Sequence, residues 1–286
     1  MTEFTEKYIN PFTDFGFKKL FGEEPNKDLL LDFLNELLKE KEGIIVDLTY
    51  LKNEQLGVGE TDRKAIFDLY CENERGEKFI VELQKTKQQF FKDRALYYST
   101  FPIREQAKSS DWNFELKAIY TVAILDFVFE EDKTDKDKLI YEVQLVDIKT
   151  CKVFYHKLTF FYIEMPKFNK TVNELDTRFD KWLYVLKNLN RLDSIPEKFQ
   201  EKIFEKLFKV AEIAKFTKEE ALSYEDSLKY YRDLKNSLDT AKEEGREERE
   251  KEIILNGINE GLSIEILMKL TNLTAIQIEK IKNGDY

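Results

Sequence analysis

Two short apolar runs, Ala65-Ile66-Phe67-Asp68-Leu69-Tyr70 and Phe79-Ile80-Val81-Glu82-Leu83-Gln84-Lys85, each place a carboxylate among apolar side chains. Both runs contain β-branched and aromatic residues, which favour strands. The pattern therefore predicts two buried β-strands, with Asp68 inside the first and Glu82 inside the second.

The residues between the two runs have the composition of a tight turn. Asn73 and Gly76 are types that turns prefer, and glycine adopts positive φ at no steric cost. A loop that ends with Gly76 at the positive-φ position makes Asn73 and Glu77 the closing pair. Counting outward from this pair brings Asp68 directly opposite Glu82, whereas a slip of one residue would put the two acids on opposite faces.

Asp68 and Glu82 are therefore expected to be neighbours on one face of a hairpin. Directly opposed residues have Cβ atoms roughly 4.5–5.5 Å apart, and like charges at that spacing repel each other. Two carboxylates inside apolar strands need a proton or a cation between them. Gln84 lies two residues further on and points to the same face. The pattern predicts a divalent-metal site; the alternative is that Glu82 lies at a wet sheet edge and that hydrogen bonds satisfy Asp68.

Histidine and cysteine usage narrows the possible chemistry. His156 is the only histidine among 286 residues. This excludes zinc sites with two or three histidines, and a Ser-His-Asp or Cys-His relay would have to use His156, which has no nucleophile motif nearby. We expect a surface or structural histidine, so any hydrolysis would depend on metal and carboxylate chemistry. Cys71 and Cys151 lie in strand-like segments and suit a reducing compartment.

The charge of the chain is acidic overall but uneven. A net charge of −10 is the wrong sign for a protein that coats nucleic acid without specificity. A basic segment nevertheless follows the second run, and a basic face beside an acidic site suits phosphate binding. A solvated helix face is the alternative. The segment carries Lys85, Lys87, Lys92, Arg94, Arg104 and Lys108 against Asp93 and Glu105.

The remaining pattern predicts helices before, between and after strands. Apolar spacing predicts a short helix that Thr13 or Asp14 caps and that Gly22 ends. The order of elements indicates an α/β or α+β fold with a mixed sheet. The further expected elements are an amphipathic helix over 26–40 that Gly43 stops, a strand over 44–51, a helix over 88–108 interrupted near Pro102, and strands over 117–127, 139–148 and 158–165.

From residue 174 onward the pattern is helical. The stretch from Asp239 to Lys251 is nearly all charged and is expected to form a solvated helical linker. After it, Ser263 is a candidate N-cap, and Thr274 with Gln277 forms a capping box, so two short helices joined by a tight turn are predicted. Such a pair resembles a helix-turn-helix, and a packing or oligomerisation element is the alternative.

A set of sequence blocks in fixed order carries a family resemblance. The blocks are Asn10-Pro11-Phe12-Thr13-Asp14, Phe17-Lys18-Lys19-Leu20-Phe21-Gly22, Phe33-Leu34-Asn35, the Asp68 strand, Glu82-Leu83-Gln84, Arg94-Ala95-Leu96-Tyr97-Tyr98, and the tail from Gly261-Leu262-Ser263 to Ile281. Together they resemble the Rpn family of recombination-promoting nucleases and transposase-like proteins, part of the PD-(D/E)XK nuclease superfamily. The blocks span most of the chain.

This resemblance implies a restriction-endonuclease-like core, with a central mixed sheet flanked by helices, and a helical C-terminal region. By analogy, Asp68 and Glu82 would bind Mg²⁺ (or Mn²⁺), with the carbonyl of Leu83 as an additional ligand. The lysine position of the superfamily falls on Gln84, a neutral amide that can orient water or phosphate but supplies no charge. Lys85 points to the other face of an ideal strand.

The resemblance also implies roles outside the two strands. Asp14 and Lys18 belong to the N-terminal motif and are additional site candidates; their alternatives are a helix cap and a solvent-facing lysine. Lys87, Lys92 and Arg94 are expected to steer the phosphate backbone of DNA.

Four segments are expected along the chain. They are a nuclease-like core at 1–170, a helical extension packed on it at 171–238, a charged helical linker at 239–252 and a small tail at 253–286.

The predicted function is metal-dependent hydrolysis of phosphodiester bonds in double-stranded DNA, as in Rpn-type nucleases of mobile elements or defence. The alternative is a catalytically degenerate nuclease fold that binds DNA or regulates, with oligomerisation through the C-terminal helices. The missing lysine and the acidic net charge favour this alternative. No apolar run is long enough to cross a bilayer, and the first residues are too polar for a signal peptide, so we expect a cytoplasmic protein.

Overall fold

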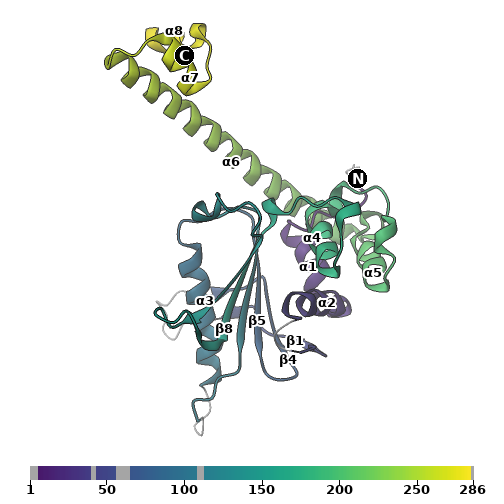
Figure 1. Cartoon of the computed structure of the whole chain (residues 1–286). Coiled ribbons are helices and arrows are strands. Elements are labelled where there is room, and N and C mark those ends of the chain that lie inside the picture. Colours follow the sequence, from purple (N-terminus) through teal and green to yellow (C-terminus); the bar gives the residue numbers. More distant parts are fainter. Residues whose placement is uncertain (1–5, 40–42, 56–64, 108–112, 285–286) are drawn as a thin grey trace. The chain divides into compact units, whose positions relative to one another are not determined.

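The computed structural model describes residues 6–39, 43–55, 65–107 and 113–284. The chain forms two compact units, Met1–Ser227 and Leu228–Tyr286. The first unit is a β-sheet between two layers of helices (Figure 1), and the second is a small helical unit. Within the described residues, no helix is both long and apolar enough to span a membrane.

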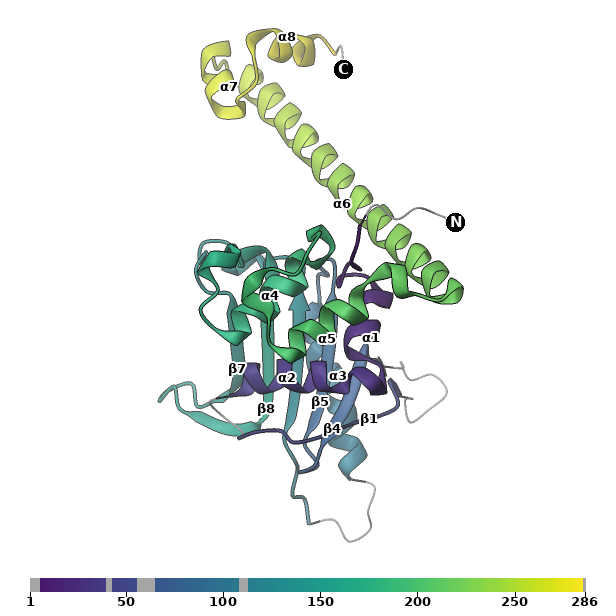
Figure 2. The same cartoon turned by 90° about the vertical axis from the view of Figure 1, so that its right-hand side faces the viewer.

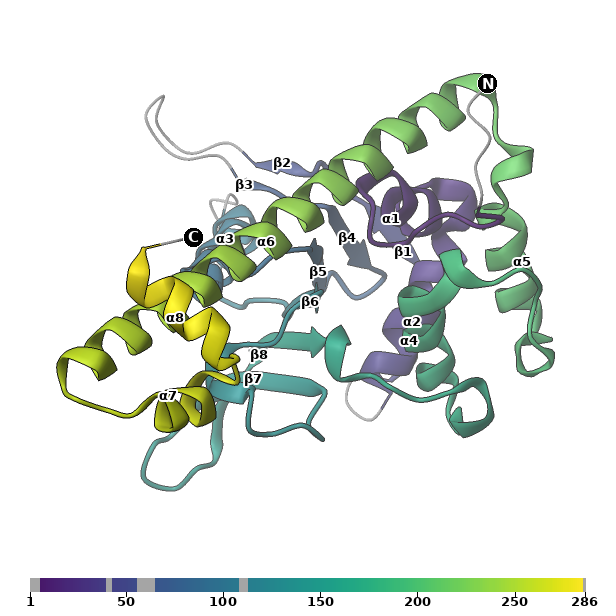
Figure 3. The same ribbon diagram turned by 90° about the horizontal axis from the view of Figure 1, so that it is seen from above.

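A six-stranded mixed sheet forms the centre of the first unit. Its strand order is β1-β4-β5-β6-β8-β7, visible from above in Figure 3. β1, β4 and β5 form an antiparallel meander, β5, β6 and β8 run parallel, and β7 returns antiparallel to β8. This order confirms the predicted mixed α/β class. The strands are β1 (Leu48–Tyr50), β4 (Leu69–Asn73), β5 (Lys78–Gln84), β6 (Ile119–Leu125), β7 (Ile140–Val146) and β8 (Val153–Glu164), and β2 (Glu54–Gln55) pairs with β3 (Ala65–Ile66) in a separate ribbon.

Helices cover both faces of this sheet. Helix α3 (Phe91–Gln106) lies on one face, and a group of four helices lies on the other (Figures 1 and 2). Strands β5 and β6 are buried along their whole length, because parallel strands at the centre of a sheet are covered on both sides. The four helices are α1 (Asp14–Phe21), α2 (Lys27–Leu38), α4 (Arg178–Asn188) and α5 (Lys202–Ala211). Short 3₁₀ turns lie at Glu24–Asn26, Glu130–Asp132, Met165–Lys167, Val172–Glu174, Leu189–Arg191, Glu197–Phe199 and Ile213–Lys215.

Aromatic side chains hold the four-helix layer together. Trp182 of α4 is fully buried and contacts Phe21 of α1, Phe33 of α2 and Phe204 of α5, with ring centroids 5.1–6.0 Å apart. Aromatic pairs in tilted or edge-to-face contact contribute beyond the area that they bury. This cluster fixes α1, and with it the N-terminal motif, against the rest of the layer.

The N-terminal motif forms a tight turn before α1, and hydrogen bonds within the motif hold this turn. Thr13 is the N-cap, its hydroxyl accepts a hydrogen bond from the Gly16 N–H at 2.9 Å, and Gly22 follows the last helical residue. The Asn10 carbonyl accepts from both the N–H and the hydroxyl of Thr13. The predicted cap and helix end are confirmed.

We expect Gly16→Ala to destabilise the first unit by about 2–3 kcal/mol, because overpacking of a tight site has that cost. An added Cβ would lie 2.1 Å from the Asn10 carbonyl oxygen and 2.7 Å from the Thr13 hydroxyl oxygen. Urea unfolding followed by tryptophan fluorescence measures the effect, since Trp182 contacts α1. Gly245→Ala is the matched control: no atom lies within 4 Å of its added Cβ, and alanine should gain about 1 kcal/mol in a helix. Equal stability of the Gly16 variant and the wild type would contradict this account.

Several predicted elements differ from the structure. Helix α3 continues through Pro102, which is buried against neighbouring residues, so packing outweighs the lost backbone hydrogen bond. Helix α2 ends at Leu38, several residues before Gly43, and the first strand is only Leu48–Tyr50. Cys151 lies in the exposed turn between β7 and β8, at φ 54°, and not in a strand.

The second unit consists of the long helix α6 (Lys218–Asn259), which begins in the first unit, with α7 (Ile264–Thr271) and α8 (Ala275–Asn283). Its core is formed by Ile254, Leu267 and Ile278, one from each helix. The predicted Ser263 cap and the Thr274–Gln277 capping box are confirmed. The charged stretch at 239–252 is an almost wholly exposed part of α6.

Candidate active site

The hairpin that presents the two acids has the predicted register. The Asn73 N–H donates to the Glu77 carbonyl, and Gly76 has φ +79°. Leu69 then pairs with Val81 and each further pair follows in step. Continued by one residue, this alignment brings Asp68 beside Glu82.

Asp68 itself lies in a bend and not in a strand, which corrects the expectation of one continuous strand. The chain pairs with β2 up to Ile66, then changes sheet and enters β4 at Leu69. Asn53 holds this bend at two points: its carbonyl accepts from the Phe67 N–H at 3.0 Å, and its side-chain amide donates to the Asp68 carbonyl at 2.9 Å. The bend turns the Asp68 carboxylate toward the backbone of β5.

Asp68 and Glu82 are joined by a reciprocal pair of hydrogen bonds. The Asp68 N–H donates to Glu82 Oε1 at 3.2 Å, and the Leu83 N–H donates to Asp68 Oδ2 at 2.7 Å. Each carboxylate therefore has one oxygen fixed by a backbone donor of the other segment. Within the described residues, no hydrogen bond occupies Asp68 Oδ1 or Glu82 Oε2.

Burial makes this pair unfavourable as two anions. Glu82 is only 9% exposed, so the wet-edge alternative does not apply to it. Burial, with the charge of Asp68 as the second cause, raises the pKa of Glu82 to about 8. Burial likewise raises the pKa of Asp68, and Asp14 adds to the rise, while the Leu83 N–H, Lys18 and Lys85 oppose it. A bound cation would relieve this repulsion.

The N-terminal motif reaches the same site from helix α1. Asp14 is the first residue of α1, and its carboxylate accepts a hydrogen bond from the Lys85 ammonium at 2.5 Å. Lys85 follows the last residue of β5 and is buried, whereas Lys18 is exposed on α1. The charges of Asp14, Lys18 and Lys85 all affect the pKa of Asp68. The contact between Lys85 and Asp14 joins distant segments of the chain, so the spacing of the strand residues could not predict it.

Gln84 is held from two sides at the end of β5. Its amide nitrogen donates to the Thr86 carbonyl at 2.8 Å, and its amide oxygen accepts from the guanidinium of Arg94 on α3. Arg94 also donates to the Gln88 side chain at 2.5 Å and lies over the Phe91 ring, 5.0 Å from its centroid. Its charge lowers the pKa of Glu82 against the effect of burial. A positive charge thus lies beside the neutral amide of Gln84.

The other two candidate phosphate contacts are engaged in ion pairs. Lys87 pairs with Glu130 at 2.8 Å, and Lys92 pairs with Glu131, both in the 3₁₀ turn after β6. All four side chains are about half exposed. The predicted basic face is therefore partly neutralised by an acidic turn, and its last member, Lys108, lies outside the described residues.

The donor set fits a hard divalent cation with an incomplete protein shell. Among the described residues, no group of three or more His, Cys, Asp or Glu side chains converges on one point. Asp68 and Glu82 supply two carboxylates, and the Leu83 carbonyl is the next oxygen along β5. Mg²⁺ commonly binds through one or two carboxylates and keeps several waters or substrate phosphates, so two acids are a sufficient anchor.

A family model described as PD-(D/E)XK nuclease family transposase matches residues 11–241. No curated protein and no solved structure gives a significant match. The match covers the N-terminal motif from Pro11 onward, the hairpin and α3, and it confirms the resemblance inferred from these blocks. The block from Gly261 to Ile281 lies outside the matched residues.

Proposed function

The chain belongs to the PD-(D/E)XK nuclease family of transposases, and from this membership we propose that it is a DNA endonuclease that depends on Mg²⁺ or Mn²⁺. In this proposal the catalytic site consists of Asp68, Glu82 and Gln84. The observation that supports it most strongly is the buried carboxylate pair, whose pKa values are both raised. A pair of this kind is costly in a fold unless an ion or a proton occupies it.

Asp68 and Glu82 would hold the ion through Asp68 Oδ1 and Glu82 Oε2, with the Leu83 carbonyl as a third protein ligand. The backbone bonds on Asp68 Oδ2 and Glu82 Oε1 keep both carboxylates in place before the ion binds. When bound, the ion lowers the pKa of water and stabilises negative charge on the phosphate. Asp14 and Lys18 would set the local charge from helix α1.

Gln84 and Arg94 would orient the reacting groups. The Gln84 amide oxygen has a second lone pair and its nitrogen a second hydrogen, so it can position a water or a phosphate oxygen while it keeps its present partners. Arg94 supplies the positive charge that a glutamine lacks, in a planar form that suits phosphate. The nearby Lys85, paired with Asp14, adds a second positive charge close to Asp68.

Double-stranded DNA is the proposed substrate, with Lys87, Lys92 and Arg94 along the phosphate backbone. Lys87 and Lys92 would exchange Glu130 and Glu131 for phosphates when DNA binds. Exposed ion pairs of this type contribute about 0–1 kcal/mol, so a DNA phosphate can displace them at little cost.

We propose the segment limits 1–170, 171–238, 239–252 and 253–286, a cytoplasmic location, and a role in recombination, element movement or defence. The C-terminal helices would bind DNA or join copies of the chain.

A second candidate function is a catalytically degenerate nuclease fold that binds DNA or regulates. Two observations favour it: a neutral Gln84 whose amide is already bonded at both ends, and the neutralisation of Lys87 and Lys92 by acidic partners. Metal binding separates the two functions, because a degenerate site has no need of an ion.

Thermal unfolding in a Mg²⁺ or Mn²⁺ titration, with EDTA as the reference, tests the proposed function. We expect stabilisation that grows with metal concentration, reaching about 2.7 kcal/mol at one hundred times the dissociation constant. Glu82→Gln is the matched control and should abolish the shift, since it removes one of the two anionic ligands. A wild-type protein that shows no metal-dependent shift would support the degenerate alternative.

A further inference from the structure

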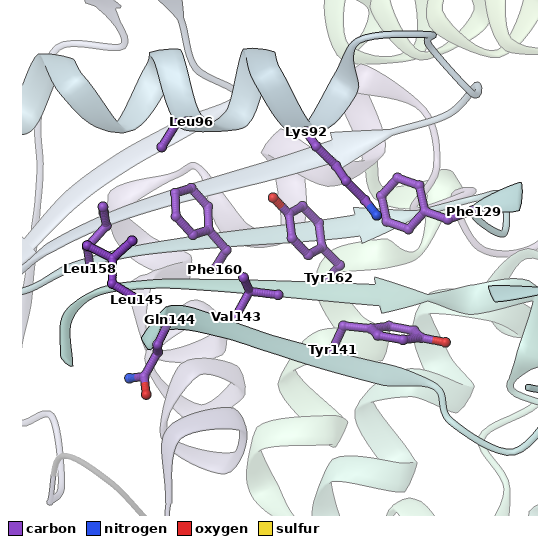
Figure 4. Close-up of a pocket in the computed structure, with 10 residues that line it drawn as sticks. All are labelled: Lys92, Leu96, Phe129, Tyr141, Val143, Gln144, Leu145, Leu158, Phe160 and Tyr162. Atoms are coloured by element: carbon purple, nitrogen blue, oxygen red, sulfur yellow. The ribbon is translucent and has the colours of Figure 1, made fainter. Parts of the chain in front are cut away.

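An apolar groove of about 340 Å³ lies between helix α3 and the strands β7 and β8 (Figure 4). Its lining comes from these three elements and from Phe129 in the loop after β6, and most of the lining side chains are apolar. Clefts that bind small molecules have volumes of about 300–1,000 Å³ and are mostly apolar, with a few polar groups that fix the ligand. The groove therefore has the size and the composition of a small-molecule site.

Two aromatic rings of β8 form the floor of this groove. Phe160 and Tyr162 are two residues apart, so they point to the same face of the sheet, and Figure 4 shows their rings side by side. The planes of the two rings differ by only 4°, with centroids 6.3 Å apart. Val143 of β7 and Leu96 of α3 flank the floor and are 45% and 53% exposed. A flat ring on this floor would stack on the two aromatic rings and cover the flanking apolar side chains.

The hydroxyl of Tyr162 is a polar group directed into this groove. Tyr162 is only 6% exposed, and within the described part of the chain its hydroxyl makes no hydrogen bond. Figure 4 shows the hydroxyl pointing from β8 toward α3. Burial raises the pKa of Tyr162 to about 12, so the group is a hydrogen-bond donor at neutral pH. Buried tyrosine hydroxyls usually have a partner, and an acceptor atom of a bound ligand would supply one here.

Lys92 brings a positive charge to the same groove. It lines the groove from the first turn of α3, and its ammonium group lies 4.3 Å from the centroid of the Phe129 ring. Its present partner is Glu131, and both side chains of this pair are about half exposed. Ion pairs of this kind contribute little to stability, so a carboxylate in the groove can take the place of Glu131. The groove thus offers two donors, one of them charged, beside a flat apolar floor.

We propose that this groove binds a small aromatic carboxylate, with its rings on Phe160 and Tyr162 and its carboxylate bonded to the Tyr162 hydroxyl and the Lys92 ammonium group. The size agrees, since an apolar cavity of about 150 Å³ holds one benzene, and a groove of about 340 Å³ has room for two fused rings with a carboxylate. A fatty carboxylate has the same head group, but its flexible chain loses more conformational freedom on binding than a rigid ring does. The proposal does not depend on the metal site.

Isothermal titration calorimetry of the full chain with 2-naphthoate tests this proposal. We expect saturable binding of one molecule per chain. Tyr162→Phe should raise the dissociation constant about tenfold, because it removes the hydroxyl donor to a charged group and keeps the ring. Thermal unfolding without ligand should be the same for this variant and the wild type, since the hydroxyl has no partner among the described residues. A less stable Tyr162→Phe protein would show that the hydroxyl is bonded within the fold and would overturn the proposal.

Lys92→Gln tests the charged contact and should also weaken 2-naphthoate binding about tenfold. Lys133→Gln is the matched control: Lys133 pairs with Glu130 at 2.6 Å in the same acidic turn and does not line the groove, so its loss should leave binding unchanged. No saturable binding of 2-naphthoate by the folded wild type would overturn the proposal. Equal affinity of the wild type and Tyr162→Phe would also overturn it, as would equally tight binding of the neutral analogue naphthalene-2-carboxamide.

Discussion

Asp68→Asn is expected to reduce metal-dependent DNA cleavage by about a hundredfold to a thousandfold while the protein remains folded, since loss of a single group that stabilises developing charge costs ~10²–10³ in rate. The asparagine carbonyl oxygen can still accept the Leu83 N–H, which Asp68 Oδ2 accepts at 2.7 Å. What disappears is one of the two anionic oxygen ligands proposed for the ion. Initial rates on a duplex substrate at saturating metal measure the effect.

Asp93→Asn is the matched control for this substitution. Asp93 is an exposed residue in the first turn of α3, and its replacement by asparagine removes the same charge from the protein as Asp68→Asn does. It should cleave at nearly the wild-type rate. A folded Asp68→Asn protein that retains activity within tenfold of the wild type would show that Asp68 does not hold the essential ion.

Glu82→Gln is expected to stabilise the metal-free protein above neutral pH. The pKa of Glu82 is raised from 4.5 to about 8 by burial and by Asp68. Between pH 4.5 and about pH 8, the folded protein therefore keeps a proton on Glu82 that the unfolded chain has released. The contribution of Glu82 to stability is present below about pH 4.5 and is lost as the pH rises through 8. Each unit of pKa difference corresponds to about 1.4 kcal/mol, so the gain at pH 8 to 9 should be a few kcal/mol.

Unfolding curves in EDTA between pH 5 and pH 9 measure this effect. The wild type should lose stability relative to Glu82→Gln as the pH rises, and the two should converge at acid pH. Glu131→Gln, in the turn after β6, is the control: it removes only the half-exposed pair with Lys92, and a change of about 1 kcal/mol or less is expected. Parallel pH profiles for the wild type and Glu82→Gln would contradict the buried-pair account.

The hairpin could be predicted from sequence because its geometry is local. Gly76 at positive φ fixes the turn, and the closing pair of Asn73 and Glu77 fixes the register. The same register continues residue by residue along the two strands. The caps at Thr13, Ser263 and Thr274 were predictable for the same reason, since each depends on three or four consecutive residues.

The surroundings of the acids could not be predicted, because they depend on segments far apart in the chain. Asn53 holds the bend that removes Asp68 from its strand, and Asp14 meets Lys85 across 71 positions. The pairs of Lys87 and Lys92 with the acidic turn after β6 follow from the parallel placement of β5 and β6. Local periodicity contains no information about such pairings.

Incubation with supercoiled plasmid would show whether DNA cleavage needs both a divalent metal ion and Asp68. Purified wild-type protein is incubated with Mg²⁺ or Mn²⁺ and with EDTA, and Asp68→Asn is treated in the same way. We expect nicked and linear DNA only where both the metal and Asp68 are present. No cleavage by a folded wild type in metal, or cleavage that persists in EDTA or in Asp68→Asn, would contradict it.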